Sequence, residues 1–111
     1  MEKVLYRVTS KYVQKCFHKQ KLYVRDEDKL IIFSGDDHET HNIGEPGGPS
    51  HLVSVDTGVV ITTENDVILF TDEGSIATLI KDMEDEIRDI VALIGGAIVI
   101  STVRDPAPRH P

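Results

Sequence analysis

Residues 52–70 read LVSVDTGVVITTENDVILF, and this stretch decides what kind of fold the chain can adopt. Three short apolar, β-branched runs at 52–55, 59–62 and 67–70 are separated by turn-forming residues at 56–58 and 64–66. Runs of this length, joined by short polar turns, predict a meander of antiparallel strands. The runs are nearly continuous rather than alternating, so at least one strand is expected to be covered on both faces.

The segments that precede the meander predict further strands and a first helix. Residues 4–8, 21–25 and 30–33 have strand composition, and the polar turn at 26–28 joins the last two into a hairpin. Between them, the segment 11–20 places apolar side chains four residues apart, which favours a short amphipathic helix; a continued strand is the alternative. The 17 residues of Gly35–His51 are rich in Gly, Pro, His and carboxylates and predict a long surface loop.

The segment that follows the meander predicts a longer helix. Its apolar residues fit one helical face, while acidic residues occupy the other, and the pair Gly95-Gly96 would end it. A last strand is expected at 97–100 and a Pro-rich tail at 105–111. The apolar positions are Ile76, Leu79, Ile80, Met83, Ile87, Ile90, Val91 and Ile94.

Together these elements predict an α+β domain over residues 1–104, followed by the tail at 105–111. We expect a mixed or antiparallel sheet of about six to seven strands with two helices on one face. A ferredoxin-like core with an inserted hairpin is one arrangement of these elements, and it carries no functional weight.

Composition excludes several classes of protein. The chain has 111 residues, of which 40% are hydrophobic and 28% charged, which is typical of one globular domain. A single Cys excludes an internal disulfide and favours a reducing compartment, so a cytoplasmic location without a membrane span is expected. The formal net charge of -7 makes binding of nucleic acid over the whole surface unfavourable.

Charge is sorted along the chain. Residues 1–25 carry +6 and the remainder carries -13, so we expect one basic face and one acidic face on the folded domain. The basic face is predicted from Arg7, Lys11, Lys15, Lys19, Lys21 and Arg25. The acidic face, on the second helix, is predicted from Asp82, Asp85, Glu86 and Asp89.

A possible metal site lies in the long loop. His38, His41 and His51 supply imidazole, a ligand that zinc and iron accept, with carboxylates between them. A Gly- and Pro-rich loop holds ligands poorly, so a solvated loop without a metal is the favoured interpretation, and no cofactor is expected. Cys16 is expected to be a small buried hydrophobe, because its apolar neighbours raise a thiol pKa.

The sorted charge leads to the functional hypothesis. We expect a small acidic protein-binding or assembly module, acting as an inhibitor, immunity, accessory or self-assembling protein through charge-complementary surfaces. Its expected partner is a second copy of itself or another protein with a basic patch. Two alternatives are a metal-dependent enzyme that uses the His-rich loop, and a nucleic-acid-binding protein that uses the basic N-terminal segment. An enzyme is the less favoured class.

Overall fold

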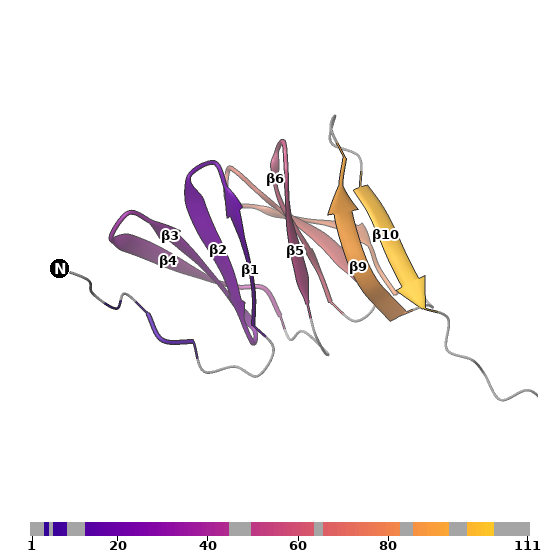
Figure 1. Cartoon of the computed structure of the whole chain (residues 1–111), viewed down its shortest axis with the longest axis horizontal. Coiled ribbons are helices and arrows are strands. Elements are labelled where there is room, and N and C mark those ends of the chain that lie inside the picture. The colour runs from indigo at the N-terminus through magenta and orange to yellow at the C-terminus, as the bar shows by residue number, and fades with distance from the viewer. Residues whose placement is uncertain are drawn as a thin grey trace, which may run out of the picture.

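The structure, a computed structural model, describes residues 4, 6–8, 13–44, 50–63, 66–82, 86–93 and 98–103. All regular secondary structure in these ranges is β, so the expected α+β class with two helices is wrong (Figure 1). The strands are β1 (Val13–His18), β2 (Lys21–Asp26), β3 (Lys29–Ser34), β4 (Asp37–Asn42), β5 (His51–Val55), β6 (Gly58–Thr62), β7 (Val67–Thr71), β8 (Ile76–Ile80), β9 (Glu86–Ala92) and β10 (Ile98–Val103).

Each strand pairs antiparallel with its neighbour in the chain, and three units result. β1–β4 form a first sheet and β5–β8 form a second sheet, each in sequential order. β9 and β10 form a separate hairpin. The predicted hairpin of residues 21–33 and the predicted meander of residues 52–70 are confirmed as β2–β3 and β5–β7.

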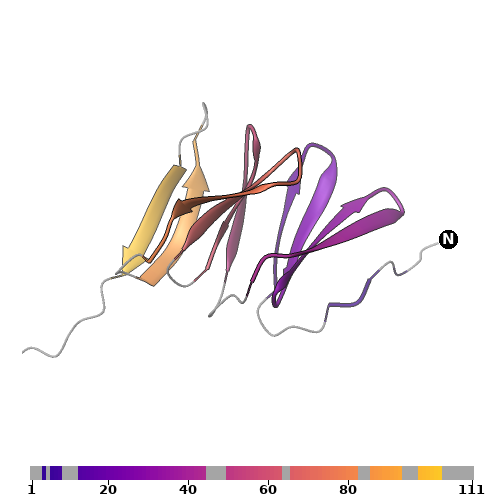
Figure 2. The same ribbon diagram turned by 180° about the vertical axis from the view of Figure 1, so that it is seen from behind.

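The three units stack as layers, with the second sheet in the middle (Figures 1 and 2). Alternate residues of each strand point to opposite faces, so the second sheet supplies side chains to two cores. The first core, against the first sheet, contains Tyr23, Leu30, Ile32, Val59, Ile61 and Phe70. The second core, against the hairpin, contains Val60, Val67, Ile87 and Ile90.

Strand β6 lies at the centre of this arrangement. All five of its residues are buried: Val59 and Ile61 point into the first core and Val60 into the second. The expectation that one strand of the meander is covered on both faces is therefore confirmed. A continuous apolar run is what such a strand requires, because neither face meets water.

The two predicted helices are strands in the structure. Residues 13–18 form β1, so the alternative interpretation of that segment is correct. The segment of the predicted helix at 76–94 contains the strands β8 and β9. Isoleucine recurs in this second segment, and its branched Cβ is better accommodated in a strand than in a helix. Met83 and Ile94 lie outside the described residues.

The predicted loop at 35–51 contains a strand that the sequence pattern hides. Residues 37–42, DHETHN, form β4, which pairs with β3 along its whole length. This edge strand is mostly exposed, so it needs no apolar residues to form. In the segment 4–8 the described residues are not in a strand, and the tail at 105–111 lies outside the described residues. The last predicted strand is confirmed as β10. In the described part of the chain, no helix could cross a membrane.

Candidate functional site

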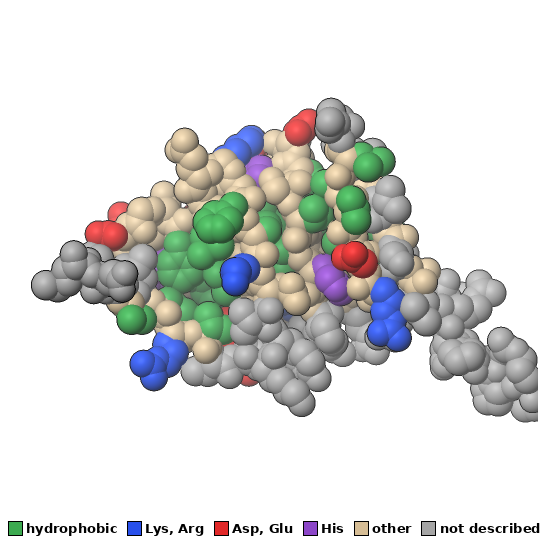
Figure 3. Space-filling model, in the orientation of Figure 1, with side chains coloured by type: hydrophobic (Ala, Val, Ile, Leu, Met, Phe, Trp, Pro, Cys, Tyr) green, Lys and Arg blue, Asp and Glu red, His purple; other side chains and the backbone are tan. Residues whose placement is uncertain are grey.

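The first sheet has an apolar outer face, which we define as the face turned away from the second sheet. The antiparallel register places Phe17, Leu22 and Phe33 in one row across β1, β2 and β3, with Val24 in the next row. The side chain of Phe17 is 73% exposed. Figure 3 shows apolar side chains gathered over this region, and the residues of the face line an open hollow of about 490 Å³.

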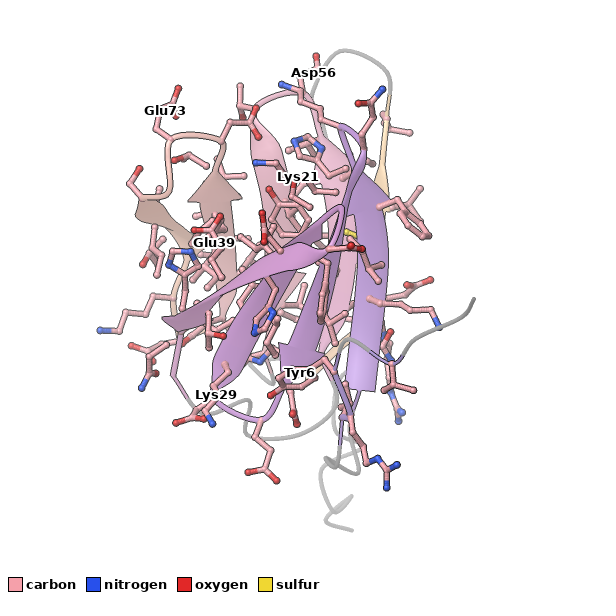
Figure 4. The ribbon with its side chains drawn as sticks, turned by 90° about the vertical axis from the view of Figure 1, so that its left-hand side faces the viewer. Tyr6, Lys21, Lys29, Glu39, Asp56 and Glu73 are labelled. Atoms are coloured by element: carbon pink, nitrogen blue, oxygen red, sulfur yellow. The ribbon has the colours of Figure 1, made fainter. Side chains whose placement is uncertain are left out.

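The N-terminal segment lies beside this face and forms one wall of the hollow. Val4, Tyr6 and Val8 line it together with the strand residues. The ring of Tyr6 contacts the rings of Phe33 and His38 edge-to-face, with centroids 5.9 and 5.8 Å apart (Figure 4). Aromatic surface left in water is unfavourable, so the exposed Phe17 side chain beside this hollow indicates a binding surface.

A polar cluster connects the first sheet to the second. His18, at the end of β1, is 4% exposed. Its Nδ1 atom lies 2.6 Å from Ser54 Oγ on β5, and its Nε2 atom lies 2.8 Å from Asp72 Oδ1, just after β7. Lys19 Nζ donates to the other oxygen of Asp72 at 2.6 Å. The cluster therefore ties β1 to two parts of the second sheet.

Hydrogen bonds lower the pKa of Asp72 in this cluster. The bond from Lys19, and next the bond from His18, hold the pKa of Asp72 below its ordinary value of 3.8, while partial burial acts in the opposite direction. A carboxyl group whose pKa is lower in the folded state stabilises the fold above its ordinary pKa, and this stabilisation is lost as the pH falls through the lowered value.

We therefore expect Asp72→Asn to destabilise the protein at pH 7 and to make little difference in strong acid. The thermal midpoints of the two proteins, measured from neutral pH to well below 3.8, should converge as Asp72 becomes protonated. A difference in midpoint that stays constant over the whole range would contradict the role assigned to the carboxylate. Asp56→Asn, at an exposed carboxylate in another turn, is the control.

The order Ser54–His18–Asp72 is that of a hydrolytic triad, and the geometry argues for a structural role instead. A nucleophile must reach its substrate and have donors for the oxyanion beside it. The imidazole is buried between the sheets, and the ammonium of Lys19 is shared with Asp72. Ser54, His18 and Asp72 are not among the residues that line the hollow on the outer face.

The residues of the predicted basic face are dispersed. Arg25 is fully buried and donates from Nε to Glu27 O at 2.8 Å and from Nη2 to Gly44 O at 2.5 Å. Lys19 is paired with Asp72. Lys21 is in register with His18, so it belongs to the opposite face from Lys15.

Of the predicted basic residues that the structure describes, Arg7 and Lys15 are exposed beside the outer face; Lys11 lies outside the described residues. Figure 4 shows Lys21 and Lys29 at opposite ends of the first sheet. The charge sorted along the sequence therefore does not gather the described N-terminal basic residues on one face.

The residues of the predicted acidic face are separated because the helix that was to carry them is absent. Asp82 lies two residues after the end of β8 with a φ of 56° and donates its backbone N–H to Asp66 Oδ1. Asp89 lies on β9 and accepts the backbone N–H of Ile90. Glu86 begins β9, and Asp85 lies outside the described residues.

The three histidines of the predicted metal site point in different directions. His38 is on the outer face of β4 beside Phe33, whereas the ring of His41 packs against Phe70 in the first core, with centroids 4.8 Å apart. His51 is on β5 next to Thr62. Within the described ranges, no three His, Cys, Asp or Glu side chains could hold a metal ion, and the proposed trio does not form a site.

Cys16 packs against the first core, and burial raises the pKa of its thiol to about 11. The thiolate needed for nucleophilic attack is therefore scarce at neutral pH. This placement agrees with the expectation of a small hydrophobic residue.

Comparison with known proteins adds no relative to this description: no family model, no curated protein and no solved structure matches the chain.

Sequence reasoning missed both features described above. The polar cluster joins residues 36 and 54 positions apart, and no local spacing announces such contacts. The outer face depends on strand register, which could have been inferred for β2 and β3 from their hairpin but not for β1, because that segment was interpreted as a helix.

Proposed function

We propose that the protein is an assembly module that associates through the outer face of its first sheet. The observation that carries the proposal is the apolar row of Phe17, Leu22 and Phe33 beside an open hollow, in which Phe17 is exposed and the other two side chains are partly buried. Covering such a face with protein removes apolar surface from water, at about 25 cal/mol for each Å² buried. The proposed partner is a second copy of the chain.

The packing inside the molecule supports this choice of partner. The chain already stacks apolar strand faces on one another twice, in the first core and in the second core. The outer face carries the same kinds of side chain, and Lys15 and Arg7 beside it add positive charge to a face of a protein with a net charge of -7. Attraction between these two cations and carboxylates of a second copy offsets part of the repulsion between two molecules of like net charge.

The test is the mass of the full chain in solution. Light scattering over a range of concentrations should give a mass that rises above 12.4 kDa for the unmodified protein. Phe17→Glu should remain at 12.4 kDa, because a carboxylate placed in the interface cannot be desolvated without a partner. Its thermal midpoint should be unchanged, since the Phe17 side chain is mostly in water in the single molecule.

Ile76→Glu provides the control. Ile76 is also a half-exposed apolar residue, but it lies on β8, away from the outer face. This variant should associate as the unmodified protein does. A chain that stays monomeric at every concentration, or equal loss of association in both variants, would refute the proposal.

A further inference from the structure

One end of the layered stack has a segment that is not paired in a sheet, and the other end has a sheet with fewer strands than the rest. At one end, the segment of residues 4–8 has strand composition, VLYRV, and its described residues are in no strand. At the other end, the hairpin has two strands where each sheet has four. Among the described strands, β10 has β9 as its one neighbour, and no described strand pairs with its other edge.

The sequence of β10 makes this edge receptive to a further strand. Residues 98–103 read IVISTV and include no charged residue and no proline. Natural sheets protect exposed edges with those residues, and an edge without them pairs readily with another chain. By contrast, the edge strand β4 reads DHETHN and carries charge.

The same end of the stack also exposes apolar side chains, next to the exposed charged residues Arg88 and Asp89. Ile87 and Ile90 point into the second core, whereas Val91 and Leu93 are 49% and 50% exposed. A layer packed on this side would cover both side chains. The first sheet's outer face, on which Phe17 is exposed from the edge strand β1, is an apolar surface of the kind that could do so.

We propose that two copies associate head to tail by strand addition. Segment 4–8 of one copy pairs with the edge of β10 opposite β9 in a second copy, and the outer face of the first copy packs on Val91 and Leu93 of that hairpin. The inference rests on the proposed function and names the contact through which assembly occurs. The added strand extends a layer that is otherwise two strands wide.

The geometry supports both halves of this contact. Tyr6 already lies against the outer face, where the next layer of the stack would lie. A five-residue strand spans about 17 Å and a six-residue strand about 20 Å, so segment 4–8 matches β10 in length. Figures 1 and 2 show the two elements at opposite ends of the molecule, with both sheets between them, so pairing within one chain is excluded.

Head-to-tail contacts of this kind leave one free end on each copy. Assembly then continues until the ends meet in a ring, or it extends as a filament. The first strands of the three units, β1, β5 and β9, lie side by side, which is the arrangement of radially repeated sheets. That arrangement favours a closed ring.

The experiment compares two matched variants of the full chain. Arg7→Pro/Val8→Pro removes two backbone donors from the segment, whereas Arg7→Ala/Val8→Ala removes the same side chains and keeps the donors. Adjacent residues of a strand direct their N–H groups to opposite sides, so one of the two prolines falls on the paired side. Two readouts are taken: the dissociation constant by light scattering and the hydrogen exchange of the amides of residues 98–103.

If strands pair, the proline variant should associate at least about tenfold more weakly than the alanine variant. Its amides at 98–103 should exchange faster by a similar factor, because they return to solvent. A synthetic peptide of residues 1–9 should dissociate the unmodified protein, and the same peptide with both prolines should not.

Three results would overturn the inference. In the first, the proline and alanine variants associate equally. In the second, assembly protects the amides of β8 (residues 76–80) from hydrogen exchange and not those of β10 (residues 98–103). In the third, the peptide does not dissociate the unmodified protein. If Phe17→Glu still abolishes association in those cases, the proposed function stands and the strand addition alone is wrong. If the unmodified chain is monomeric, both proposals fail.

Discussion

Gly58→Ala should destabilise the protein more than the other substitutions proposed for it. A Cβ atom at residue 58 would lie 2.1 Å from the carbonyl oxygen of Phe70 and 3.0 Å from its carbonyl carbon, so the new methyl group would collide with the backbone of β7. Gly58 is buried at the start of β6, and β6 has neighbours on both sides and both faces. Overpacking costs about 1–3 kcal/mol and occasionally more, and here the collision is with backbone atoms, so we expect a cost of about 3 kcal/mol or more.

Urea denaturation monitored by circular dichroism would measure this loss. Gly35→Ala is the matched control, since nothing lies within 4 Å of a Cβ at residue 35 and its φ of 62° is the main obstacle. That substitution should cost about 1–2 kcal/mol, the usual penalty of the left-handed region. If both alanine variants unfold at the same urea concentration, the close contact between β6 and β7 is not present in solution.

Ile87→Ala should have the second largest effect. Ile87 is 4% exposed and packs with Val60, Val67 and Ile90 in the second core. Removing three carbon atoms from a closed core costs about 2–5 kcal/mol, through lost burial and the cavity left behind. The free energy of unfolding from urea titration is the measurement.

Leu79→Ala is the comparison for this substitution. Leu79 is 46% exposed on β8, so its truncation should cost at most about 1 kcal/mol, because full burial of such a side chain contributes only about 1.5–3 kcal/mol. A loss at Ile87 no larger than the loss at Leu79 would mean that the hairpin does not pack on the second sheet through the face that carries Ile87.

The strands of residues 21–33 and 52–70 could be predicted because their signals are local. Their apolar runs are short, and turn residues separate them at the spacing that antiparallel strands require. The burial of β6 on both faces could also be predicted, since a continuous apolar run contains no residue suited to a wet face.

The helix predicted at 76–94 could not be distinguished from two strands, because bulges imitate helical spacing. In β9, Ile87 pairs with Thr102 and Asp89 with Ser101, so Arg88 is an extra residue and Ile87 and Ile90 face the same side. In β8, Ile80 pairs with Val67 and Thr78 with Ile68, which leaves Leu79 as the extra residue. A bulge turns a period of two into a spacing of three, and three is also a spacing of the helix.

The charge pattern was misleading for a related reason. Residues of like charge lie on one surface only if their spacing in the sequence matches the side-chain repeat of the helix or strand that carries them. The lysines at 11, 15 and 19 would share one face of a helix, but the strand β1 and its turn separate Lys15 from Lys19. Arg25, which the sequence places at the end of this basic segment, is buried among backbone carbonyls.

The position of β6 has a consequence for how the molecule loses its structure. Val59 and Ile61 serve one core, and Val60, between them in sequence, serves the other. If β6 detaches from the second sheet, the first core and the second core are exposed to water together. The first sheet and the β9–β10 hairpin then both lose the apolar surface on which they pack. The first sheet and the hairpin therefore do not melt independently: the five residues of β6 make the three layers one cooperative unit.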